Sequence, residues 1–173
     1  MNRGLSEKAT IYNYTLLKKC GYGKLPSSIY ITILLLWGAG CFLWHYSGAL
    51  GLLLALPAVH GLYYVLIRLI KRFTPWSADF SWLWTKNLPW NGYLPEGYIR
   101  NRFLLSIHMH LLLTGAAIIG AAYIWVPVPV FATFMFVHIW TLLPRLWILQ
   151  QLKQVHPHGL IKITADELLL YST

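Results

Sequence analysis

Charged residues are scarce in this sequence, and acidic residues are nearly absent. Only 11% of the 173 residues are charged, and Asp and Glu together number five against fourteen Lys and Arg. A soluble domain of this size carries about 25% charged residues, so these side chains could not cover a surface that faces water. The scarcity of charge excludes a soluble enzyme.

Cysteine and the common catalytic motifs are also missing or sparse. The two cysteines, Cys20 and Cys41, form no C-x-x-C arrangement, so neither a disulfide nor a zinc site is indicated. There is no H-E-x-x-H motif, no phosphate-binding loop and no G-x-S-x-G motif. The sequence therefore favours a protein without catalytic activity, while leaving an enzyme open.

Apolar residues, by contrast, make up 57% of the chain, which excludes disorder because disordered segments lack such side chains. Four apolar runs are long enough to cross about 30 Å of hydrocarbon at about 1.5 Å per residue: Ser28–Trp44, Ala49–Ile70, Phe103–Trp125 and Val128–Leu149. Short links join the first two and the last two, so each pair is expected to form a tight antiparallel hairpin. The predicted fold is an all-α integral membrane protein with four transmembrane helices.

The basic residues predict the orientation of these helices. Five of the fourteen Lys and Arg lie in residues 1–27, six lie between Arg68 and Arg102, three lie from Arg145 onward, and the two hairpin tips carry none. Basic residues near span ends stay on the cytoplasmic side. We therefore expect both termini in the cytoplasm of a bacterium, and the helices in its inner membrane. Because the charges are scattered along membrane boundaries, they indicate lipid headgroups and not nucleic acid as the partner.

The chain thus divides into a cytoplasmic or interfacial segment (1–27), a first hairpin (28–70), a middle loop (71–102), a second hairpin (103–149) and a tail (150–173). Residues 6–20 predict a short interfacial helix that ends at Gly21. In the tail, residues 156–159 are expected to form a turn. Thr164 and Glu167 fit a helical capping box, but the flanking residues favour a small β-hairpin that turns at residues 165–167.

The middle loop is rich in aromatic residues, which a solvated loop has no use for. Such rings are typical of an aromatic belt at the membrane interface. This is the favoured interpretation, and the alternative is a docking surface for a partner. The tryptophans considered for docking are Trp76, Trp82, Trp84 and Trp90.

Four histidines lie inside the apolar runs, where ionisable residues are rare and usually face a bundle interior. At about 100° per residue, His110 shares a face with Ser106 and Thr114 and is expected to meet a neighbouring helix. His108 points about 200° away from His110, so it is expected to face headgroups or another subunit.

Counting about 1.5 Å per residue from the inner boundary, His60 and His138 lie at about 15 Å and His110 at about 10 Å. Convergence of these three would create a site for a transition metal or haem. The alternative, which we favour, is that each imidazole forms a hydrogen bond between helices. Candidate polar contacts are Tyr64, Ser106, Thr114 and Thr141.

Three functions remain open. The favoured hypothesis is a non-catalytic membrane subunit that assembles with itself or with partner proteins through its helices and its aromatic loop. The second is a redox protein in which His60, His110 and His138 bind haem or a metal. The third is an oligomeric channel or transporter, in which Arg68 and Arg145 would favour anions. The favoured interpretation of Arg68, Arg102 and Arg145 is that they anchor the helices at the inner membrane boundary, which requires no channel.

Overall fold

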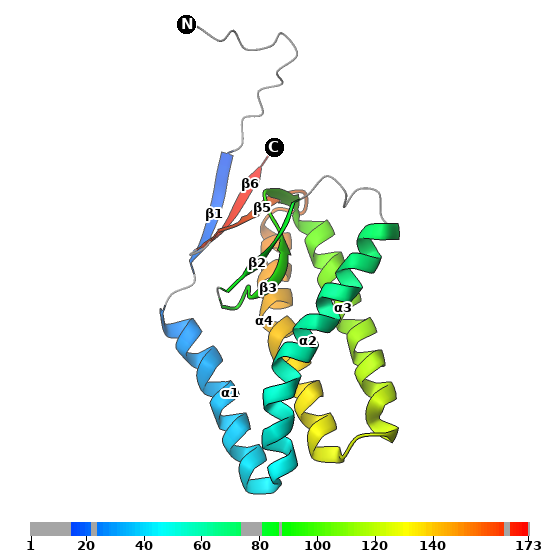
Figure 1. Cartoon of the computed structure of the whole chain (residues 1–173). Helices are drawn as coiled ribbons and strands as arrows, with labels where there is room; N and C mark the ends of the chain where they lie inside the picture. The colour runs from blue at the N-terminus through cyan, green and yellow to red at the C-terminus, as the bar shows by residue number, and fades with distance from the viewer. Residues whose placement is uncertain (1–14, 22–23, 74–80, 87, 165–166, 173) are drawn as a thin grey trace, which may run out of the picture.

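A bundle of helices with a small β-sheet at one end makes up the fold (Figure 1). The computed structural model describes residues 15–21, 24–73, 81–86, 88–164 and 167–172. Within these residues four helices are long and apolar enough to cross a membrane. They are α1 (Lys24–Trp44), α2 (Tyr46–Phe73), α3 (Asn101–Ala121) and α4 (Val128–Val155). The four predicted helices are therefore confirmed, and α1, α2 and α4 run beyond the predicted apolar runs.

The helices form two hairpins in series, as predicted. A single residue, His45, separates α1 from α2, and its ring Nδ1 accepts a hydrogen bond of 3.1 Å from the backbone N–H of Ser47. This bond satisfies one of the amides that the first turn of α2 leaves open. The short 3₁₀ helix η2 (Ala122–Ile124) links α3 to α4.

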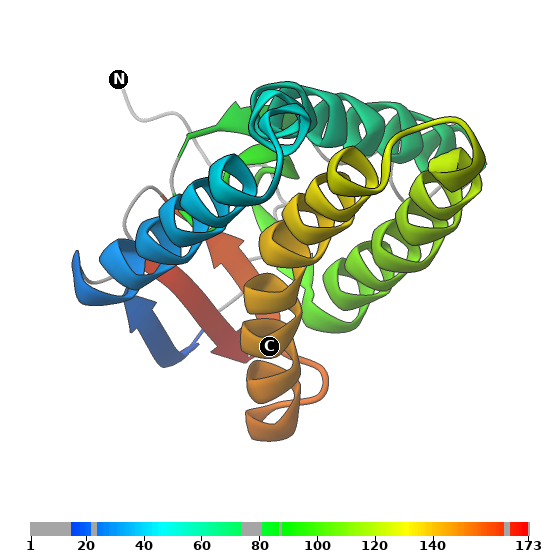
Figure 2. The ribbon, with the colours of Figure 1, turned by 90° about the horizontal axis from the view of Figure 1, so that it is seen from below.

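Helix α4 contacts each of the other three helices, and Figure 2 shows it between α1 and α3. Helix α1 is the most peripheral, since only 11% of its apolar span is buried inside the molecule. Stacked aromatic rings attach it to α4. The ring centroids of Tyr30 and Trp140 lie 3.9 Å apart, and those of Trp37 and Phe136 lie 4.2 Å apart. The indole of Trp140 also donates a hydrogen bond of 3.1 Å to the backbone oxygen of Tyr30.

The sheet joins segments that lie far apart in the sequence. Its strand order is β1 (Thr15–Gly21), β6 (Glu167–Ser172), β5 (Leu160–Ile163) and β4 (Tyr98–Arg100), and each neighbouring pair is antiparallel. The sheet therefore ties the N-terminal segment, the middle loop and the tail into one layer at the end of the bundle.

Strand β1 corrects the prediction of a helix over residues 6–20. Residues 15–20 are extended and pair with β6, from Thr15 opposite Ser172 to Gly21 opposite Glu167, while residues 6–14 lie outside the described residues. The helical signals in this stretch are local, whereas the strand is fixed by a partner from the tail, and such tertiary pairing overrides local preference.

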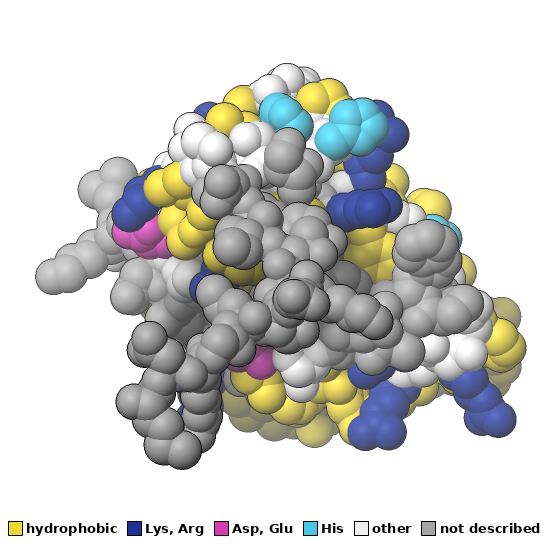
Figure 3. All heavy atoms as spheres, turned by 90° about the horizontal axis from the view of Figure 1, so that it is seen from above, with side chains coloured by type: hydrophobic (Ala, Val, Ile, Leu, Met, Phe, Trp, Pro, Cys, Tyr) yellow, Lys and Arg dark blue, Asp and Glu magenta, His cyan; other side chains and the backbone are white. Residues whose placement is uncertain are grey.

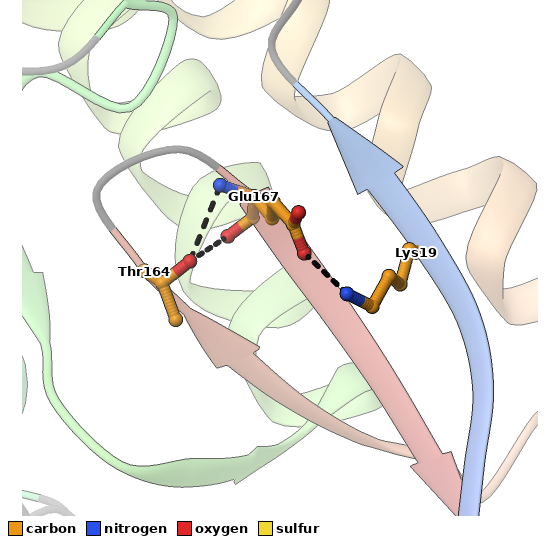
Figure 4. A network of polar contacts seen from close by, with 3 residues as sticks. All are labelled: Lys19, Thr164 and Glu167. Carbon is orange, nitrogen blue, oxygen red and sulfur yellow. Dashed lines mark hydrogen bonds and ion pairs between the residues drawn. The ribbon is translucent and has the colours of Figure 1, made fainter.

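The tail confirms the predicted hairpin. Thr164 stabilises the turn of this hairpin and does not cap a helix. Its Oγ1 donates to the backbone oxygen of Glu167 at 2.8 Å and accepts from the Glu167 amide at 3.2 Å (Figure 4). Lys19 of β1 forms an ion pair of 3.3 Å with Glu167. The turn expected at residues 156–159 is also present, because the Gly159 amide donates to the oxygen of His156.

The middle loop contains a second hairpin, made of β2 (Trp82–Thr85) and β3 (Gly92–Pro95), that contacts α2. Two groups of buried apolar residues form the core. One lies between α2, α3 and α4, with Val59, Leu111 and Val137 among its members. The other lies between the sheet and the adjoining ends of α3 and α4, around Trp90 and Ile161.

Candidate functional site

The segment that links β2 to β3 enters the helical bundle and covers a buried arginine. Arg145 lies in α4 and is only 3% exposed. Its Nε donates to the backbone oxygen of Pro89 at 2.7 Å, and its Nη2 donates to the Oδ1 of Asn91 at 2.7 Å and to the Asn91 backbone oxygen. The prediction of Arg145 as a boundary anchor is therefore wrong, because the middle loop wraps its guanidinium inside the molecule.

Asn91 extends this network to helix α2. Its Nδ2 donates to the Nε2 of His60 at 3.0 Å, and the Nδ1 of His60 donates to the backbone oxygen of Leu56 at 2.7 Å. Asn91 thus connects α4 to α2, and both ring nitrogens of His60 are occupied. The following residue, Gly92, has a φ of +108°, and a Cβ there would lie 3.1 Å from the His60 ring, so glycine is required for this close approach. We call Arg145, Asn91 and His60 the arginine network.

A second network joins the middles of three helices. The Tyr63 hydroxyl of α2 donates to the Nδ1 of His138 at 2.9 Å, and the His138 backbone oxygen lies 3.2 Å away. The Nε2 of His138 donates to the backbone oxygen of Leu112 in α3 at 3.0 Å. Gly115 makes room for this ring, since a Cβ there would lie 2.4 Å from the Cε1 of His138.

His108 lies beside the arginine network, fully buried, so its predicted exposure to headgroups or another subunit is wrong. Its Nδ1 donates to the backbone oxygen of Leu104 at 2.9 Å, and its Nε2 bonds to no described residue. The indole nitrogen of Trp82 is likewise buried without a described partner. Both side chains line a small cavity with Arg145 and His60. The space open inside it is about 10 Å³, close to the least that one water molecule needs.

His110 does not join the other histidines, so the convergence considered for a metal or haem site does not occur, and the hydrogen bond between helices that was favoured for His110 does not form either. Its side chain is exposed on the outer face of α3, and its Nδ1 donates to the backbone oxygen of Ser106 in the same helix at 2.7 Å. Within the described residues, no three His, Cys, Asp or Glu side chains are grouped so that they could hold a metal ion. Because His60 and His138 each use both ring nitrogens, ligation of a metal or haem would break bonds that join the helices.

Two of the other predicted polar contacts, Thr114 and Thr141, donate hydrogen bonds within their own helices. Thr114 donates to the backbone oxygen of His110, and Thr141 donates to the backbone oxygen of Val137 at 2.8 Å. Tyr64 packs its ring against Trp84 and Tyr93. The hydroxyl that meets a histidine is that of Tyr63, one residue before the predicted Tyr64.

Two of the four candidate docking tryptophans are part of the core. Trp90 is fully buried and Trp82 is 9% exposed, whereas Trp84 is 56% exposed; Trp76 lies outside the described residues. Basic side chains of α2 lie over two aromatic rings in this region: the Arg68 guanidinium is 5.1 Å from the centre of the Tyr64 ring, and the Lys71 ammonium is 5.5 Å from the centre of the Trp82 ring. Arg68 and Arg102 are both exposed. Of the three candidate tryptophans that the structure describes, Trp84 is the one that remains on the surface for a partner.

Asn91 was missed because a lone asparagine between Trp90 and Gly92 resembles an ordinary turn. The printed hydrogen bonds of Arg145 go to backbone and amide oxygens of the middle loop, and no charge pattern in the sequence pointed to these groups. Comparison with protein families, curated proteins and solved structures finds no match for this chain.

Proposed function

We propose that this protein is an integral membrane subunit, inserted in the bacterial inner membrane by its four helices, that assembles with further copies of itself. The chain carries no acidic residue in any apolar run. Apart from Arg145, the Lys and Arg of the described residues lie on the sheet strands, in the middle loop or near the helix ends that adjoin them. Figure 3, viewed from the end that bears the sheet, shows Lys and Arg side chains at several places around the face. This distribution favours a cytoplasmic position for the sheet.

A polar stripe on the outer face of α3 carries the proposal of assembly. The stripe is formed by small or polar residues at helical spacing, and every one of them is exposed: Ser106, His110, Thr114, Ala117 and Ala121. None of the described residues covers it. The sequence pattern predicted that this face meets a neighbouring helix, and within one copy of the chain the described helices do not supply that neighbour.

The polar character of the stripe favours a protein neighbour over lipid. Ionisable residues in membrane spans usually face protein or water. The Nδ1 of His110 donates within its own helix, which leaves Nε2 as an acceptor for a group on another helix. Small residues such as Ala117 and Ala121 let two helices approach closely, and hydrogen bonds between helices add about 0.6 to 2 kcal/mol each.

Cysteine crosslinking tests the proposal in membranes. In a background with Cys20→Ser and Cys41→Ala, Ala117→Cys should form a disulfide-linked dimer on mild oxidation. Leu53→Cys is the matched control, because Leu53 is exposed on the outer face of α2 at a similar distance from the hairpin tips. Equal dimer yields at both positions would mean random collision and would contradict the proposal.

Mass measurement in gentle detergent provides the second test. The wild-type chain of 19.9 kDa should give a mass at least twice that of the monomer after subtraction of detergent. His110→Leu should shift the population towards monomer, whereas Met109→Leu, one position away on α3, should leave it unchanged. A wild-type monomer that shows no crosslinking would contradict assembly of copies.

Reporter fusions test the membrane position independently of assembly. Lys86 precedes the buried segment of the middle loop, and Lys153 lies near the end of α4. Fusions after both residues should report the cytoplasmic side. Reporters on opposite sides would overturn the number of membrane-crossing helices, whatever the oligomeric state.

A further inference from the structure

A cavity of about 350 Å³ opens between β1, the start of α1 and the sheet-proximal part of α4. None of its described lining residues belongs to the arginine network, although one of them, Pro89, accepts a hydrogen bond from Arg145. Its volume lies within the range of about 300 to 1,000 Å³ that is typical of ligand sites. Its lining residues are Lys18, Cys20, Gly21, Ser27, Tyr30, Pro89, Pro144, Trp147, Ile148, Gln151 and Leu152.

The cavity exists because α1 touches α4 only along part of its length. The stacked rings of Tyr30 and Trp140 hold the two helices together, and Tyr30 also lines the cavity. Above this contact, towards the sheet, Trp147 and Ile148 form an apolar wall on α4. Trp147 is 68% exposed, so this wall continues onto the apolar outer surface of the bundle.

The opposite side of the cavity is basic and polar. Neighbouring residues in a strand point to opposite faces, which places Lys18 with Cys20 on the cavity side and Lys19 on the other side, where it pairs with Glu167. No acidic residue lines the cavity, and Lys18 is its one charged lining residue among the described ones. A ligand with an anionic head and an apolar body would complement both sides.

We propose that this cavity binds one acidic phospholipid from the cytoplasmic leaflet. The phosphate lies near Lys18 and Gln151, and the upper part of an acyl chain lies along Tyr30, Trp147 and Ile148 in the gap between α1 and α4. Anionic lipids are concentrated in the cytoplasmic leaflet, at the depth where the proposed orientation places β1. This proposal rests on membrane insertion but does not depend on assembly of copies.

The test is native mass spectrometry of the full-length protein, released from detergent with added phosphatidylglycerol or phosphatidylcholine. The wild type should retain one phosphatidylglycerol per chain and bind phosphatidylcholine more weakly. Lys18→Gln should weaken retention about fivefold, since one basic residue near a membrane surface is worth about that factor. Lys86→Gln is the matched control, because Lys86 is an exposed lysine outside the cavity.

A second variant tests the apolar wall without changing charge. Ile148→Trp places a larger ring in the cavity and should abolish retention of the single lipid, while circular dichroism confirms that the helices remain folded. Retention of phosphatidylglycerol by both variants at the wild-type level would overturn the proposal. Equal retention of the two lipids, or displacement of the lipid by millimolar inorganic phosphate alone, would also overturn it.

The outcomes separate this proposal from the proposed function. A chain that binds one phosphatidylglycerol as a monomer supports the lipid site and contradicts assembly. A chain that crosslinks through Ala117→Cys but retains lipid without preference supports assembly and contradicts the lipid site. Reporter fusions that place Lys86 and Lys153 on opposite sides of the membrane would contradict the proposed membrane insertion, on which the lipid site and the assembly of copies both rest.

Discussion

The guanidinium of Arg145 in α4 and the side-chain amide of Asn91 in the middle loop bind each other inside the bundle, at 2.7 Å from Nη2 to Oδ1, although 54 residues separate them. The same amide donates to His60 on α2 at 3.0 Å. Arg145 lies ten residues before the end of α4, which is about 15 Å along the helix axis. One loop side chain thus links two helices well below the end of the bundle.

Asn91→Leu should destabilise the protein by about 2 to 4 kcal/mol, because it takes an acceptor from a buried cation and a donor from the His60 ring. The free energy of unfolding can be measured by titrating folded protein in mixed micelles with a denaturing detergent. The double variant Asn91→Leu with Arg145→Met should be less destabilised than Asn91→Leu alone, since no buried charge remains. If the free energy of unfolding of the double variant falls by the sum of the decreases in the two single variants, the two residues are not coupled and the prediction is wrong.

Gly115→Ala should cost about 1 to 3 kcal/mol by overpacking, because the added methyl would collide with the His138 ring and force α3 away from α4. Gly120→Ala on the same helix is the control, since a Cβ there meets nothing within 4 Å. That change should be neutral or stabilise by up to about 1 kcal/mol through helix propensity. Thermal unfolding of both variants in the same detergent separates these effects, and equal melting temperatures would argue against the close contact.

Tyr63→Phe should lower stability by about 0.6 to 2 kcal/mol, since it removes the hydroxyl bound to the Nδ1 of His138. Tyr64→Phe, one residue along, should have little effect because the Tyr64 side chain acts through ring packing. The two variants can be compared by equilibrium unfolding. A larger loss for Tyr64→Phe would show that the described pairing of Tyr63 with His138 is incorrect.

Thr164→Val should loosen the tail hairpin without affecting the helices, because Thr164 Oγ1 makes two of the bonds that hold the turn. We expect faster amide hydrogen exchange in β5 and β6, matching a loss of about 0.5 to 1.5 kcal/mol, and unchanged exchange in α2 and α3. Lys19→Met should change exchange much less, since exposed ion pairs contribute about 0 to 1 kcal/mol. Uniformly faster exchange throughout the helices would contradict this separation.

Hydropathy alone predicted the four helices and the two helical hairpins, because an apolar run is a property of contiguous residues. The sheet was harder to predict. Only the β5 and β6 hairpin, closed by a local turn, was found, whereas β1 needs β6 and β4 needs β5 as partners from distant parts of the chain. Residues 15–20 were consequently predicted as a helix.

The histidines of α3 show the same limit at the level of one side chain. Helical geometry gave the angle between His108 and His110 but not the rotation of the helix in the bundle. The assignment depended on the rule that polar and small residues face inward. The rule failed because Trp90 and Trp82, supplied by the middle loop, pack on the side that carries His108.

The position of β6 between β1 and β5 has a consequence for the order of events during translation. A ribosome completes β1 and all four helices before it makes residues 167–172, so β1 has to wait for its hydrogen-bonding partner while the helices are already emerging. Helix synthesis and sheet closure are therefore separate steps in time. During the interval between them, the backbone amides of the nascent β1 strand are open to water, chaperones or the strands of a neighbouring chain.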